Sequence, residues 1–137
     1  MVRFLGSLGV IVVATALSSA CSGPDDASVT KDGEDLVIAW DGAAARLCVT
    51  EPNAWCPQDK DDKVTGGKAF WVIDATCFNG GDGFPAPVHY RKVPDCAKDV
   101  TEAHGGPAGG AQLVRGETYR VMITGFGGDP AIQSFTW

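Results

Sequence analysis

Short runs in which apolar and polar residues alternate make up most of this chain. In the run 118–124, Tyr119, Val121 and Ile123 share one face, and polar or mixed positions lie between them. This two-residue period is typical of a β-strand that packs one face on a core. No segment has a helical period of useful length, so the pattern indicates an all-β protein.

Seven such runs are expected to form strands: 36–40, 44–50, 68–76, 86–91, 112–114, 118–124 and 131–137. Turn-forming residues separate them, and Gly127-Gly128-Asp129-Pro130 predicts a hairpin between the last two runs. About seven short strands with turn-rich gaps predict an antiparallel β-sandwich over residues 35–137. The glycine-rich segment 98–110 lacks the pattern, and we expect it to be a mobile surface loop.

The N-terminal region has a different pattern. Arg3 is the only charged residue before Asp25, and the residues from Phe4 to Leu17 are apolar or small. A positive start, a short apolar core and the small residues that follow predict a signal peptide over residues 1–20. The apolar run is shorter than the roughly 20 residues that a transmembrane helix needs. Residues 21–34 are polar and acidic without periodicity, which predicts a flexible tether about 20 Å long.

Five cysteines are present, an odd number for an exported protein. Setting Cys21 aside leaves an even set, which an oxidising compartment would pair as two disulfides. Three pairings are open, and proximity in sequence favours Cys48–Cys56 and Cys77–Cys96. A zinc site that uses cysteines with a histidine is the alternative, but the spacings contain no C-x-x-C pair.

The string L-S-S-A-C, from Leu17 to Cys21, resembles the lipobox of bacterial lipoproteins. Ser18 departs from the family pattern, which usually has leucine at that position. The resemblance implies cleavage before Cys21 and lipid on its sulfur, so membrane lipid is the expected partner. It also implies a place in the bacterial cell envelope: Ser22 favours the outer membrane where a cell has two membranes, and otherwise the expected place is the outer face of the cell membrane.

A second resemblance lies in the string L-V-R-G-E-T-Y-R-V-M-I. Leu113 precedes a turn at Gly116, and Tyr119 opens a strongly alternating run. This resembles the tyrosine corner of immunoglobulin-like and fibronectin type III-like domains. It implies that the Tyr119 hydroxyl bonds to backbone upstream, within an immunoglobulin-like sandwich. The Cys…Trp…Cys spacing of antibody domains is absent.

Charge narrows the classes of partner. The chain has 11 basic and 17 acidic residues and a net charge of −6. Removing residues 1–20 deletes one cation, Arg3, and no acid, so the mature chain carries −7. Without a basic stripe the protein is not expected to bind nucleic acid, whose recognition depends on neutralising phosphates.

No familiar catalytic motif is present, and we expect neither an enzyme nor a bound metal or cofactor. His89 and His104 are predicted to be surface histidines. The acidic loop 59–62 and Asp82 are predicted to be solvated, because they lack the spaced ligands of a calcium-binding loop.

Trp55 is the one candidate binding residue. It lies in the turn-rich string E-P-N-A-W-C-P beside Cys56, and a rigid exposed indole would suit a glycan or protein partner. We expect it more simply to pack over one end of the sandwich. The leading hypothesis is a membrane-anchored, non-catalytic binding or structural domain with candidate loops at 53–63 and 98–110. A carbohydrate-binding module for cell-wall or envelope glycans is the alternative, and an enzyme with an unfamiliar site is the second alternative.

Overall fold

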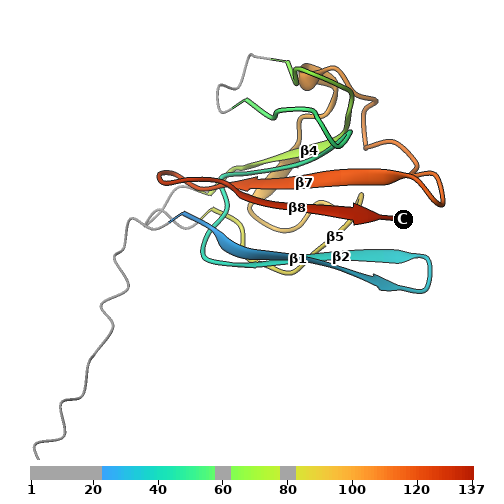
Figure 1. Ribbon diagram of the computed structural model, residues 1–137. Coiled ribbons are helices and arrows are strands. Elements are labelled where there is room, and N and C mark those ends of the chain that lie inside the picture. Colours follow the sequence, from blue (N-terminus) through green and yellow to red (C-terminus); the bar gives the residue numbers. More distant parts are fainter. Residues whose placement is uncertain (1–22, 58–62, 78–82) are drawn as a thin grey trace, which may run out of the picture.

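The computed structural model describes residues 23–57, 63–77 and 83–137 (Figure 1). The expected signal peptide and lipidated Cys21 lie outside the described residues, as do the acidic loop 59–62 and Asp82.

Two antiparallel sheets pack face to face (Figure 1). The smaller sheet has the strand order β1 (Asp25–Asp32), β2 (Asp35–Asp41), β5 (Val88–His89). The larger has the order β6 (Ala97–Asp99), β4 (Ala69–Ala75), β3 (Arg46–Thr50), β7 (Thr118–Thr124), β8 (Ala131–Thr136). A 3-10 helix, η2 (Glu102–His104), follows β6. The prediction of an all-β antiparallel sandwich is confirmed.

The core lies between the sheets and consists of the alternate apolar residues of each long strand. Its fully buried members include Leu36 and Ile38 from β2, Leu47 and Val49 from β3, Trp71 and Ile73 from β4, and Val121 and Ile123 from β7. Complete burial of each aliphatic side chain stabilises the fold by about 1.5–3 kcal/mol. Trp40 adds an edge-to-face contact with Phe84, whose ring centroid lies 5.9 Å away.

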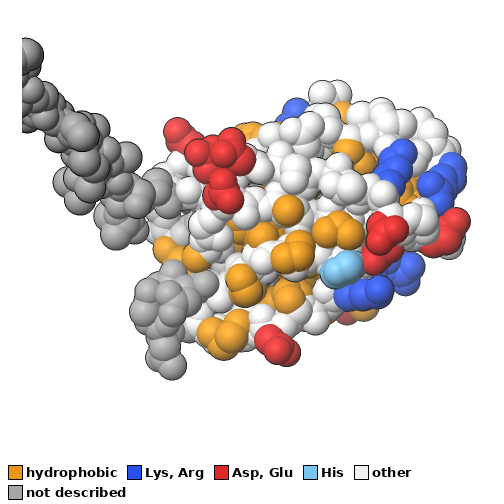
Figure 2. Space-filling model, turned by 90° about the horizontal axis from the view of Figure 1, so that it is seen from below, with side chains coloured by type: hydrophobic (Ala, Val, Ile, Leu, Met, Phe, Trp, Pro, Cys, Tyr) orange, Lys and Arg blue, Asp and Glu red, His pale blue; other side chains and the backbone are white. Residues whose placement is uncertain are grey.

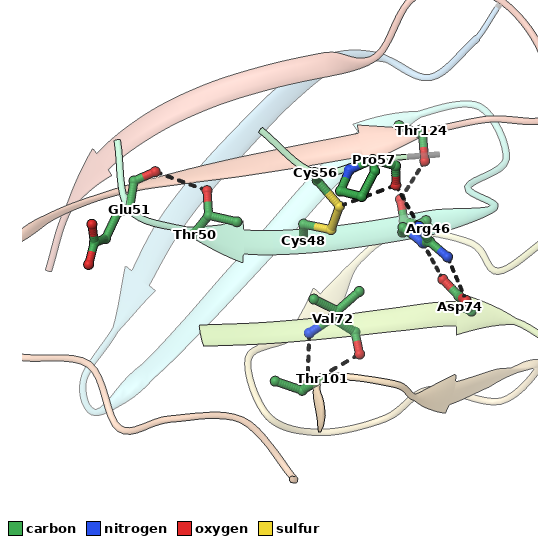
Figure 3. The surroundings of a disulfide bond; sticks show 10 residues. All are labelled: Arg46, Cys48, Thr50, Glu51, Cys56, Pro57, Val72, Asp74, Thr101 and Thr124. Atoms are coloured by element: carbon green, nitrogen blue, oxygen red, sulfur yellow. Dashed lines mark hydrogen bonds and ion pairs between the residues drawn. A yellow bond between two sulfur atoms is a disulfide. The ribbon is translucent and has the colours of Figure 1, made fainter. Parts of the chain in front are cut away.

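Strand β3 is buried on both faces, because the segment after it folds back over the outer side of the larger sheet. Cys48, Cys56, Ala69, Val72 and Met122 form a second, smaller apolar cluster there. A disulfide joins Cys48 to Cys56 and holds the returning segment in place (Figure 3).

The expected two disulfides are both present. The second joins Cys77, which follows β4, to Cys96, which precedes β6. Both pairs are the ones that proximity in sequence favoured. The first links β3 to the segment that follows it, and the second links the segment after β4 to the residue before β6.

The guanidinium of Arg46 also holds the returning segment, and it forms an ion pair with β4. It donates to both carboxylate oxygens of Asp74, at 2.6 and 3.0 Å, and to the carbonyl of Pro57 at 2.5 Å (Figure 3). Arg46 is only 5% exposed, so its charge needs these partners.

The prediction of a flexible tether over residues 21–34 is wrong from Asp25 onward. Residues 25–32 form β1, which pairs with β2 along its length. Because β1 is an edge strand with one outward face, only Ala27 and Val29 pack on the core and the apolar pattern is weak. The sandwich therefore begins about ten residues earlier than expected.

The prediction of an unstructured loop over 98–110 is also wrong in its first half. Strand β6 pairs with β4, and η2 follows it. Thr101 ties this segment to the sheet: its hydroxyl accepts from the Val72 amide at 2.8 Å and donates to the Val72 carbonyl at 3.3 Å (Figure 3).

Two expected strands are shorter than their patterns suggested. The run 86–91 forms only Val88–His89, and 112–114 forms no strand. Pro85 and Pro87 lack the amide hydrogens that a longer ladder would need.

Tyr119 makes the expected corner. Its hydroxyl, on a side chain only 3% exposed, accepts a hydrogen bond from the Val114 amide at 2.7 Å. The ring packs on Phe70 and Phe135, with centroids 5.0 and 5.7 Å away.

We predict that Tyr119→Phe lowers the free energy of unfolding by about 1–2 kcal/mol, because the Val114 amide loses its acceptor while the ring packing is kept. Denaturant unfolding followed by tryptophan fluorescence measures this. Thr118→Val is the control: it removes an exposed hydroxyl contact to Thr136 on the same strand and should change stability by no more than about 0.5 kcal/mol. Equal losses in the two variants would contradict a structural role for the corner.

Candidate functional site

The sandwich has two distinct ends. The described chain starts at Gly23 beside the β7–β8 turn, where a Cβ on Gly23 would lie 2.8 Å from the carbonyl oxygens of Gly127 and Asp129. We call this the N-terminal end. The β1–β2 turn and Trp137 lie at the far end (Figure 1), about 25 Å away by the rise of an eight-residue strand.

A cleft of about 500 Å³ lies at the far end. This volume is within the range of small-molecule sites. Its apolar wall consists of Leu36, Leu113, Tyr90 and Trp137. Its polar lining consists of Asp32, Glu34, Asp35, Arg91, Lys92 and Gln112.

Asp35 and Glu34 already have partners on the acidic side of the cleft. The His89 Nδ1 atom donates to Asp35 Oδ2 at 2.5 Å, and Lys92 Nζ lies 3.8 Å from the same oxygen. The hydrogen bond from His89 lowers the pKa of Asp35 below its ordinary value of 3.8, the charges of His89 and Lys92 lower it further, and loss of solvent opposes them. Glu34 pairs with Arg115 at 3.1 Å.

Arg91 is on the basic side, in a tight turn. The Lys92 amide donates to the His89 carbonyl at 3.0 Å, which closes the turn. Arg91 occupies its third position with φ of 64°, a conformation that favours glycine. Its Nε donates weakly to the Gly109 carbonyl at 3.4 Å, and within the part of the chain that the structure describes it has no ion pair.

Tyr90 forms the fixed back wall of the cleft. Its hydroxyl donates to the Ala111 carbonyl at 2.6 Å, and its ring meets Trp71 edge-to-face at 5.3 Å. Burial raises the pKa of Tyr90 well above its ordinary value of 10.0, so the phenol stays neutral and keeps donating. These contacts fix the residue next to Arg91.

Trp137 forms the other aromatic wall. The Arg115 guanidinium lies 4.0 Å from the centre of its indole ring, and Lys31 Nζ lies 5.8 Å from it. Both are cation–π contacts, which favour the ring's position at the mouth of the cleft.

Trp55 is not packed over the end of the sandwich as expected, because 48% of its side chain is exposed. Its backbone is nevertheless held on both sides. It exchanges two hydrogen bonds with Thr65, at 2.7 and 3.1 Å, and the Arg120 guanidinium donates to the Ala54 carbonyl at 3.2 Å. With Cys56 in a disulfide, Trp55 is an exposed aromatic side chain on a rigid loop.

The prediction of two surface histidines is right for His89 and wrong for His104. His89 has 44% of its side chain exposed beside Asp35. His104 is 1% exposed, because η2 lies against the outer layer and the Val64 amide donates to its carbonyl. The two histidines therefore do not share a site.

Within residues 23–57, 63–77 and 83–137, no cluster of three or more His, Cys, Asp or Glu is placed to hold a metal ion. The same ranges contain no helix with the length and hydropathy needed to cross a bilayer. No protein-family model, curated protein or solved structure matches this chain. The far-end cleft and the exposed Trp55 are therefore the two candidate sites of this protein.

We predict that Asp35→Asn lowers the stability of the protein where the Asp35 carboxyl of the wild type is ionised, and not at the low pH at which it is protonated. The lowered pKa of Asp35 means that its ion pairs stabilise the fold above the unfolded pKa and cease to do so as the pH falls through the folded pKa. The difference in Tm between wild type and Asp35→Asn should be constant above about pH 5 and vanish towards about pH 2. Thermal unfolding monitored by circular dichroism over that range measures it. Asp32→Asn, across the same turn, controls for the loss of one carboxylate, and a pH-independent difference for Asp35→Asn would contradict the assignment.

Proposed function

We propose that the protein is a bacterial lipoprotein, acylated at Cys21, whose sandwich binds a small ligand in the far-end cleft without catalysis. The observation that carries the proposal is the position of the cleft: it lies at the end of the sandwich opposite the start of the domain. A domain held at its N-terminal end would present this cleft away from the membrane, towards molecules in the surrounding compartment.

The short connection to the anchor favours a fixed orientation. Only Ser22 separates Cys21 from Gly23, where the described domain begins, so the two could be at most about 7 Å apart. The acidic side chains of Asp25, Asp26 and Asp41 are exposed at this end, and acidic residues gather there beside the grey segment (Figure 2). Anionic headgroups would repel these side chains, which favours an orientation in which the far end of the sandwich points away from the membrane.

An immunoglobulin-like assignment is supported by the strand order. Such sandwiches place A, B and E in one sheet and C, F and G in the other, with C′ beside C in the variable type. Assigning β1, β2 and β5 to A, B and E, and β4, β3, β7 and β8 to C′, C, F and G, reproduces this order. Tyr119 then lies near the start of strand F, where a tyrosine corner belongs, and β6 is an addition to the pattern.

The anchor is tested by metabolic labelling with palmitate in a bacterial host. The wild-type chain should incorporate label and sediment with membranes, and Cys21→Ser should do neither, because the thioether to diacylglycerol cannot form. Ser22→Ala keeps the cysteine and should behave like wild type. Label retained by Cys21→Ser would overturn the anchoring proposal.

Trp55 favours a second candidate function, binding of cell-wall or envelope glycans. Its rigid backbone and half-exposed ring suit stacking against a sugar face at a small cost in conformational entropy. This site lies on the outer layer of the larger sheet, apart from the far-end cleft, so the two functions can be tested separately.

We predict that Trp55→Ala abolishes sedimentation of the soluble Cys21→Ser form with insoluble peptidoglycan, if glycans are the ligand. Phe126→Ala is the matched control, because Phe126 is similarly exposed, at 52%, but lies at the N-terminal end. Unchanged sedimentation of Trp55→Ala, or equal losses in both variants, would rule out Trp55 as a glycan platform.

A further inference from the structure

We infer that the far-end cleft takes a ligand in which a carboxylate is attached to an apolar group, with Arg91 binding the carboxylate. The inference rests on the proposed function, since it names the class of ligand for the same cleft. Acidic and basic side chains gather around the pale blue histidine at one end of the molecule (Figure 2).

The internal pairing of charges leaves Arg91 as the available cation. Asp35 accepts a hydrogen bond from His89 and lies 3.8 Å from Lys92 Nζ, and Glu34 pairs with Arg115. A cationic ligand would have to displace these contacts. An anionic ligand would meet the Arg91 guanidinium, whose two terminal nitrogens make no hydrogen bond or ion pair within the described ranges. Asp32 is the other lining charge without an ion pair there, and it lies at the exposed end of β1.

The backbone at Arg91 supports a role that is not structural. A left-handed conformation is unfavourable for arginine, and glycine would fit this turn with less strain. Retaining a strained residue makes sense where its side chain is used. The fixed Tyr90 on one side and the Lys92 amide bond on the other hold the backbone of Arg91 at the rim.

The apolar wall of the cleft indicates which group the ligand carries besides its carboxylate. Leu36 and Leu113 are only 1% and 8% exposed, so the accessible apolar surface of the cleft comes mainly from the half-buried rings of Tyr90 and Trp137. Gln112, next to Leu113, supplies a neutral donor and acceptor on the lining. A branched aliphatic or aromatic group would fill the wall while its carboxylate reaches Arg91 in a bidentate pair.

Such a carboxylate has two natural sources, the C-terminus of a peptide and a free organic acid, and the probes separate them. Amide NMR spectra of the soluble Cys21→Ser form are titrated with N-acetyl-L-leucine, its C-terminal amide, the peptide Ala-Ala-Leu with a free C-terminus, and 4-methylpentanoate. We expect saturable shifts at Leu36, Gln112 and Leu113 with the acids, and affinity at least tenfold weaker for the amide. Preference for the peptide identifies a chain end, and preference for 4-methylpentanoate identifies a free acid; either supports the inference.

Two variants of Arg91 separate charge from folding. Arg91→Gly should keep or raise the Tm, because the turn is relieved, and Arg91→Gln should keep the fold. Both variants should lower the affinity for the acids at least tenfold and leave the affinity for the amide unchanged. Lys98→Gln, which removes an exposed cation from β6, should bind like the parent form.

Three results would overturn the inference in different ways. Equal affinity for acid and amide would remove the carboxylate requirement but leave the cleft as a ligand site. Equal weakening by Lys98→Gln would show a general effect of net charge. No shift at the cleft with any probe would reject both the inference and the cleft in the proposed function, whereas palmitate labelling would still decide the anchor.

Discussion

The burial of β3 on both faces is the constraint on which the larger sheet depends. Its inner side chains, Leu47 and Val49, belong to the main core, and its outer side chains have to be covered as well. Arg46 also needs partners on this outer side, because a guanidinium that is 5% exposed destabilises the fold unless it is paired. Asp74 supplies the charge, the Pro57 carbonyl supplies a further acceptor, and the returning segment is thereby bonded to the sheet.

The same constraint reaches the candidate sites. Once Cys56 and Pro57 are held against β3, the loop that carries Trp55 has little freedom, and its pairing with Thr65 completes the arrangement. The far-end cleft depends instead on Tyr90, which joins the core through Trp71 and the 105–117 segment through the Ala111 carbonyl. Each candidate site is thus a short irregular segment attached to a buried strand and to one neighbouring segment, which is how a sandwich presents side chains precisely enough for recognition.

The sequence predicted the strands that bury one face and failed where burial is partial. Strands β2, β3, β4 and β7 each place alternate side chains in the core, so the two-residue period is visible. Most side chains of β8 are exposed, and this strand was predicted together with the hairpin turn at Gly127-Gly128-Asp129-Pro130. Strands β1 and β6 are edge strands with mostly exposed side chains, and they are held by backbone pairing that leaves little trace in composition. His104 is buried by the path of η2, which no periodicity indicates.

The candidate sites, too, could be predicted only where a local sequence pattern marks them. Trp55 was found because an aromatic residue beside a cysteine in a turn-rich string is visible in sequence. The pairing of Asp35 with His89 joins residues 54 positions apart and depends on the β2–β5 register. Arg91 carries no signal, because the positive φ that makes it unusual belongs to the fold and arginine is not a residue that turns usually select at that position.

The protein is acidic as a whole, and the pairing of charges within the cleft decides what the cleft can bind. The chain as a whole is acidic, which would repel an anion at long range. At physiological ionic strength, however, exposed charges are screened beyond about 8 Å, so the charges that line the cleft have the strongest effect on a ligand there. Within the cleft, two of the three carboxylates are already paired, so a ligand that reaches the wall formed by Leu36 and Leu113 meets a guanidinium rather than the average charge of the surface.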